Sequence, residues 1–330
     1  MAESTLSISR TDLRVRIAHF LGYGRDSSVW TTEESAIIDD CIADGLRAFY
    51  FPAPSETAPS GHEWSFLKPV LTLQVWGSIA VAAATTVTGV YDGVAYTTVT
   101  ATAASFYPSM IGKTLVITDI GSFTVTSYTS STVIVVAGNA TAVATTFSMT
   151  ADGTYRLPDA FGGMEGNWTF ATNEGHNPIP RVSEAQIRTL YIPGTATGRP
   201  QYGAVRPVQS DGSGGQRWEA YFWPTPDGTY NLSYQQVMLM DTLSAGYPYV
   251  LGGMVHTQTI IESCLAAAEL RMNDGPGAHT AAFAVRLAAS IAHDRRLGPS
   301  YLGYNGDSSS DANARLSRVS YVTVGGVLYE

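Results

Sequence analysis

Two amphipathic helices near the C-terminus constrain the fold most, because each carries an apolar face that has to be buried. Between residues 258 and 272 the apolar residues recur at three- and four-residue steps, which places them on one helical face. The run NDGPG at 273–277 ends that helix, since proline cannot continue the hydrogen-bond ladder. A matching stripe over 283–291 predicts a second helix that ends at Leu297. On pattern alone, the pair is a helical hairpin that fills its own core.

Two more helices are expected near the N-terminus. The first covers residues 9–21, and the second runs from an N-cap threonine before Glu33 and Glu34 to about Tyr50. Cys41 and Cys264 both fall on apolar stripes, so we expect two buried, reduced thiols, and nothing in the spacing indicates a disulfide between them.

The character of the chain changes between residues 71 and 151. Only Asp92, Lys113 and Asp119 carry charge there, while Thr, Val, Ala and Ser dominate, which is typical of β-structure. Short strands are expected at 115–117, 123–126 and 132–136, with a turn at 127–131 between the last two. This stretch predicts an inserted small β-barrel or sandwich module.

A second β region follows, from about 153 to 247. Strands at 217–223 and 230–238, joined by the turn sequence PTPDG, predict an aromatic-rich hairpin. The C-terminal residues 319–327 alternate like a strand that has no partner in its own domain. Two alternatives stay open there: pairing with another chain, or a tail that is disordered or packs on itself.

Composition excludes several classes of protein. The net charge is −9, with only two lysines, so this is no basic nucleic-acid binder. Charged residues make up 14% of the chain, against about 25% in a typical domain. Cover by other subunits and a Thr- and Ser-rich surface explain that deficit equally well. The N-terminus lacks the pattern of a signal peptide and no apolar run is long enough to cross a membrane, so we expect assembly in a cytoplasm.

Catalytic and metal-binding motifs are not evident. His62-Glu63 opens like a zinc-protease motif, but the second histidine that this motif needs is replaced by Phe66. We therefore expect Trp64 and Phe66 to be packing residues, and we predict no enzyme activity, no metal and no cofactor.

Three stretches together resemble a known family. They are YPYVLGG at 247–253 with His256 and ESCLAAAE at 262–269, then GLRAFY at 45–50 with HEWSFL at 62–67, and WPTPDGTY at 223–230. Their order and character resemble the head-to-tail adaptor (connector) proteins of tailed bacteriophages, and the gate or tail tubular proteins of short-tailed phages. The resemblance implies a structural virion protein of the neck, a dodecameric ring that joins the portal to the tail or nozzle proteins. DNA would pass through its channel without sequence-specific binding, and no membrane would be involved.

The resulting expectation is an α+β protein. A helical bundle from the N- and C-terminal segments would be flanked by a β region that carries the inserted module. The expected division is 1–70 (helical part), 71–151 (inserted β module), 152–255 (β-rich part), 256–298 (helical hairpin) and 299–330 (extended tail).

The C-terminal tail carries the residues that we expect to contact the portal or a neighbouring subunit. They are Tyr301, Tyr304, Arg315, Arg318, Tyr321, Val322 and Val324. The alternative function is a receptor- or glycan-binding virion protein that acts through the inserted module. An enzyme such as a wall hydrolase ranks below both, because no paired carboxylates stand out.

Overall fold

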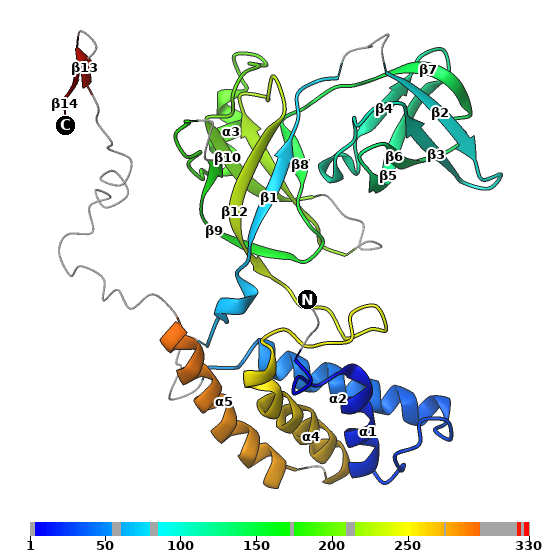
Figure 1. Ribbon diagram of the computed structural model, residues 1–330, viewed down its shortest axis with the longest axis vertical. Helices are drawn as coiled ribbons and strands as arrows, with labels where there is room; N and C mark the ends of the chain where they lie inside the picture. Colours follow the sequence, from blue (N-terminus) through cyan, green and yellow to red (C-terminus); the bar gives the residue numbers. More distant parts are fainter. Residues whose placement is uncertain are drawn as a thin grey trace.

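The computed structural model describes residues 4–54, 61–79, 85–171, 175–208, 215–273 and 275–297, together with the backbone of 322–324 and 327–329. The fold is α+β, as predicted (Figure 1). All the described α-helices but one gather at one end, two three-stranded sheets form the middle, and a closed barrel lies beside the sheets.

The N-terminal helices α1 (Arg10–Phe20) and α2 (Thr32–Tyr50) begin where the sequence indicates. Ser9 caps α1 and Thr31 caps α2, and each hydroxyl accepts a hydrogen bond from the third backbone N–H of its helix. The carboxylates of Asp12 and Glu34 accept in return from the backbone N–H of the capping residues. Both starts are therefore fixed by local sequence.

The predicted hairpin near the C-terminus is formed by α4 (Thr257–Asn273) and α5 (Ala278–Leu297). Glu269 of α4 reaches across the turn, and its carboxylate accepts from the backbone N–H of Gly277, His279 and Thr280 at 3.1, 3.3 and 3.0 Å. Hydrogen bonding, chiefly from Thr280, lowers the pKa of Glu269. The first N–H groups of a helix lack partners within it, so Glu269 caps α5 from the preceding helix.

One hydrophobic core is shared by α1, α2, α4 and α5. Its members include Leu13, Ile17, Ile38, Leu46, Phe49, Ile260, Cys264 and Ile291. The backbones of α2 and α4 touch at Gly45, where an added Cβ would lie 2.5 Å from Cys264 Cα. Cys41 and Cys264 are both buried, which confirms the predicted burial, and neither forms a disulfide within the described residues.

The middle of the molecule consists of two antiparallel sheets. One has the order β1 (Val70–Val75), β12 (Tyr230–Met238), β9 (Phe161–Phe170), and the other has β10 (Tyr202–Pro207), β11 (Trp218–Trp223), β8 (Thr154–Arg156). The short helix α3 (Glu184–Leu190) packs on β10 and β11.

The predicted hairpin of the strands at 217–223 and 230–238 is wrong. Both strands exist, as β11 and β12, but they lie in different sheets. The connection between them is held by a third segment: the Thr225 N–H donates to Ala196 O, and the Gly198 N–H donates to Thr225 O, both at 2.9 Å. Anchored there, the chain leaves one sheet and enters the other instead of turning back.

Six strands close the barrel in the order β2-β3-β6-β5-β4-β7. They are β2 (Thr86–Tyr91), β3 (Tyr96–Ala101), β4 (Thr114–Ile117), β5 (Gly121–Ser130), β6 (Val133–Ala137) and β7 (Ala142–Met149). Of the two architectures left open for this stretch, the barrel is the one formed. The turn expected at 127–131 is wrong, because β5 continues to Ser130 and pairs with β6 through two register shifts. The polar residues at 127–131 have the composition of a turn, although most of them continue β5.

Lys113 docks the barrel on the sheets. Its side chain is 13% exposed, and its Nζ lies 2.8 Å from both carboxylate oxygens of Asp152 and also donates to Thr154. Burial would raise the pKa of Asp152, but the charge and hydrogen bond of Lys113 and the hydrogen bonds from Thr154 together outweigh burial, and the pKa is lowered. The hydroxyl of Tyr155, the residue after Thr154, donates to the carbonyl of Trp76. A single apolar core therefore runs from the barrel into the sheets.

Candidate interaction surfaces

The residues proposed from the sequence as contacts fall at the C-terminus. Tyr301, Tyr304, Arg315, Arg318 and Tyr321 lie outside the described residues. Val322 and Val324 belong to β13 (Val322–Val324), which pairs antiparallel with β14 (Val327–Tyr329). The expected lone strand is therefore one half of a hairpin, because the two glycines at 325–326 separate two short runs that can pair.

A buried polar cluster ties α5 to the segment before β1. Asp294 is 3% exposed and accepts from the backbone N–H of Ser65 at 3.1 Å and from its hydroxyl at 2.6 Å. His62 Nε2 lies 2.8 Å from Asp294 Oδ2, the oxygen that also accepts from the backbone N–H of Ser65. Burial would raise the pKa of Asp294, but these hydrogen bonds outweigh burial and the pKa is lowered. The cluster fixes the end of α5 against the chain that leads to the sheets.

Aromatic rings surround His256 beside this cluster. The centroids of Trp64, Phe66 and Phe49 lie 5.1, 5.4 and 5.9 Å from the centroid of His256. Trp64 is 1% exposed and stacks on Phe66, which confirms that both are packing residues. Burial lowers the pKa of His256, because an apolar cage disfavours the charged ring.

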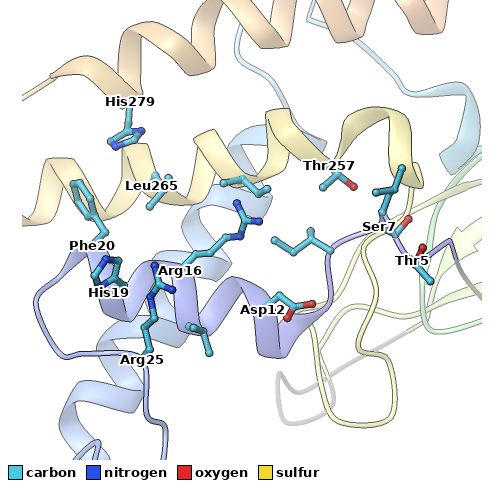
Figure 2. A pocket seen from close by; sticks show the side chains of 14 residues that line it. Thr5, Ser7, Asp12, Arg16, His19, Phe20, Arg25, Thr257, Leu265 and His279 are labelled. Atoms are coloured by element: carbon cyan, nitrogen blue, oxygen red, sulfur yellow. The ribbon is translucent and has the colours of Figure 1, made fainter.

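A groove of about 930 Å³ runs between α1 and α4 (Figure 2). Phe20, Ile261 and Leu265 give it apolar walls. Arg16 projects into it from α1, and Arg25 projects from the loop that follows α1. Neither arginine forms an ion pair with a described residue.

The acidic side chains near this groove are already engaged. Asp12 belongs to the capping box of α1. Glu262 binds His279 with 2.8 Å between Oε2 and Nδ1, and it is only 12% exposed. The groove therefore combines apolar walls with polar side chains, and its charged side chains that lack an ion-pair partner among the described residues are Arg16 and Arg25.

A second groove, of about 600 Å³, lies between α2 and the α4–α5 pair. Ala266, Ala267 and Leu270 line it from α4, and Asp44 lines it from α2. The Arg271 side chain reaches Asp40 of α2 with 3.3 Å between Nη1 and Oδ2.

The two grooves face opposite ways. Ile261 lies in the first and Leu270 in the second. They are nine residues apart, which at about 100° per residue puts them on opposite sides of α4. The four helices α1, α2, α4 and α5, called the helical layer below, thus have a groove on each of two opposite faces.

Enzyme-like features do not emerge from the described part of the chain. Within it, no group of three or more His, Cys, Asp or Glu side chains is arranged to hold a metal ion. Nor, among the helices described, is any long and apolar enough to cross a membrane.

A comparison with protein-family models decides the family. The model described as SU10 adaptor protein matches residues 117–303, more than half of the chain. The chain belongs to the SU10 adaptor protein family. This confirms the predicted resemblance to phage adaptor proteins, and it makes the protein a structural adaptor rather than a member of an enzyme family. A search of curated proteins found no match to the sequence.

Two features of this adaptor could not be found from its sequence. His62 and Asp294 are separated by 232 residues, and neither belongs to a motif that predicts their contact. The grooves depend on how α1, α2 and α5 are placed around α4, which periodicity does not give. A usable signal for the first groove was the pair of exposed arginines on and after α1, because Asp12, the acidic residue four positions before Arg16, is used by the capping box of α1.

Proposed function

We propose that the protein is the head-to-tail adaptor of a tailed-phage virion, a dodecameric ring that links the portal to the tail and forms part of the DNA channel. The observation that carries this proposal is the family match over residues 117–303. That match extends from the barrel through the sheets into α4 and α5, so it is not limited to a widespread β module.

The partners are the portal above the ring and the tail or nozzle and tail-completion proteins below it. The net charge of −9 and the scarcity of charged side chains favour a channel wall that DNA crosses without binding. The protein would sit in the neck of the virion after assembly in the host cytoplasm.

The chain would be divided by role. Residues 1–70 and 256–298 would form the helical part of the ring, 152–255 its β-rich part, and 71–151 an outward module. The position of the barrel, beside the sheets and away from the helices, supports this assignment (Figure 1).

The tail from 299 to 330 would contact the portal or the neighbouring subunit. Tyr301, Tyr304, Arg315, Arg318 and Tyr321 would make side-chain contacts, and Val322 and Val324 would lie in the hairpin that accompanies them. A chain that ends at Leu297 should keep its own fold and lose binding to the portal in a pull-down assay. Replacing the exposed Val94 of the barrel with Ala should leave that binding unchanged.

Cryo-electron microscopy of purified virions tests the proposal directly. A ring of this chain between portal and tail is the expected result. Density only at a peripheral fibre or spike would overturn it and favour the alternative, a receptor- or glycan-binding protein that acts through the barrel.

A further inference from the structure

The two grooves of the helical layer differ in charge. The first, between α1 and α4, is bordered by Arg16 and Arg25, which have no ion-pair partner among the described residues. Beside the second groove, α2 exposes Glu33, Asp40 and Asp44. These three residues are spaced by seven and four positions, so they form one acidic ridge along the helix.

The ridge carries more negative than positive charge. Asp40 contacts Arg271, and Asp44 contacts Arg47 at 2.7 Å, but all four side chains are between 47% and 70% exposed. Ion pairs this exposed contribute little to stability, so both carboxylates can pair elsewhere. Glu33 is exposed and caps nothing, since the capping box of α2 uses Glu34.

The opposite placement of the two surfaces has a consequence for assembly. A contact between two different surfaces of identical chains is heterologous, and it generates a ring when the rotation between copies closes. An isologous dimer would instead bring the same surface of each copy together, and here that would place arginines against arginines or carboxylates against carboxylates.

We infer that the α2 ridge of one copy docks in the α1–α4 groove of the next copy. Asp40 and Asp44 would face Arg16 and Arg25, while Phe20 and Leu265 would receive the exposed Ala36 beside the ridge. The ridge from Glu33 to Asp44 spans about 17 Å, and α1 from Asp12 to Phe20 spans about 12 Å, so the surfaces are similar in length. This inference rests on the proposed ring and names the surfaces that build it.

Charge reversal in the full-length chain tests the pairing. One variant carries Arg16→Glu and Arg25→Glu, and a second carries Asp40→Arg and Asp44→Arg. Either variant alone sets like charges against each other, which opposes docking. We expect the concentration at which half of the chains are assembled, measured by sedimentation velocity, to rise by about tenfold or more in each variant. Placing like charges against each other in an interface weakens the affinity by at least a factor of about ten.

Recombining the variants supplies the decisive measurement. An equimolar mixture should form rings that contain the two species in equal numbers by native mass spectrometry. A chain that carries all four changes should assemble on its own. Arg188→Glu, at an exposed arginine of α3 on the β region, is the matched control and should assemble like the wild type. Circular dichroism identifies any variant that fails to fold.

The outcomes distinguish an error in the inferred pairing from an error in the proposed ring. Wild-type rings that persist in both reversed variants, or folded variants that no recombination restores, would overturn the inferred pairing and leave the adaptor function standing. A wild-type chain that stays monomeric both alone and with the portal would overturn the ring and the pairing together.

Discussion

Replacing Gly45 with Ala should destabilise the helical layer, although the same change stabilises most helices. Gly45 lies inside α2 at the point where this helix crosses α4. An added Cβ would lie 2.5 Å from Cys264 Cα, 2.6 Å from its backbone nitrogen and 2.8 Å from its Sγ. Two of these three atoms are backbone, so a side-chain rotation cannot remove the clash.

Two opposing effects set the change in the free energy of unfolding caused by Gly45→Ala. Alanine is favoured over glycine in a helix interior by about 1 kcal/mol. Carbon atoms in normal contact are about 3.5–4.0 Å apart, so α2 and α4 would have to separate by about 1 Å at this crossing. Overpacking of this kind costs about 1–3 kcal/mol, and an immovable backbone obstacle places the cost at the upper end. The expected net loss in the free energy of unfolding is about 1–2 kcal/mol.

Urea unfolding followed by far-UV circular dichroism measures this loss. Ala36→Gly, at an exposed position of the same helix, is the control for propensity alone and should cost about 1 kcal/mol. Adding Cys264→Ala to Gly45→Ala should restore little, since the backbone contacts remain. A Gly45→Ala protein as stable as the wild type, or more stable, would show that the backbones of α2 and α4 leave room for a Cβ at this crossing.

Three further changes test other contacts. Glu269→Gln should lower the thermal midpoint at neutral pH. Because the pKa of Glu269 is lowered in the fold, the difference from wild type should shrink as pH falls below 4.5, the ordinary value, through the folded pKa. For His256 the folded pKa is also lowered, so wild-type stability should decrease as pH falls below 6.5, and His256→Phe should flatten that part of the pH profile of the midpoint. Lys113→Met should speed proteolytic cleavage near Asp152, where the barrel meets the sheets, and leave hydrogen exchange inside the barrel unchanged, since the barrel core does not include this side chain. Equal cleavage rates would argue that Lys113 does not hold the barrel.

Local signals in the sequence predicted the helices well. Ser9 and Thr31 mark helix starts because their hydroxyls satisfy N–H groups only a few residues away. The stop after Asn273 depends on proline and glycine, which act within one turn. Such features need no knowledge of the rest of the chain.

Pairing across long distances could not be predicted in the same way. The residues of β11 and β12 have the pattern of a hairpin. The two strands lie in different sheets instead, and the connection between them is held by backbone hydrogen bonds between residues 196–198 and Thr225. The contact of His62 with Asp294 likewise depends on the final packing of α5. A sequence pattern reports the exposed and buried faces of one element, whereas these contacts depend on the relative position of two.

The barrel enters and leaves the body of the protein at adjacent points. Ile79 and Met149 exchange two backbone hydrogen bonds, at 2.8 and 2.9 Å, just where the chain departs and returns. The cost in chain entropy of bringing such ends together grows only slowly with the length of the segment between them, so segments of different length are tolerated there. In a gene this is a favourable place for recombination. Exchanging the segment between positions 79 and 149 would replace the whole barrel while every strand of the two sheets kept its neighbours. Related phages could then differ completely in this part of the surface and still build the same body.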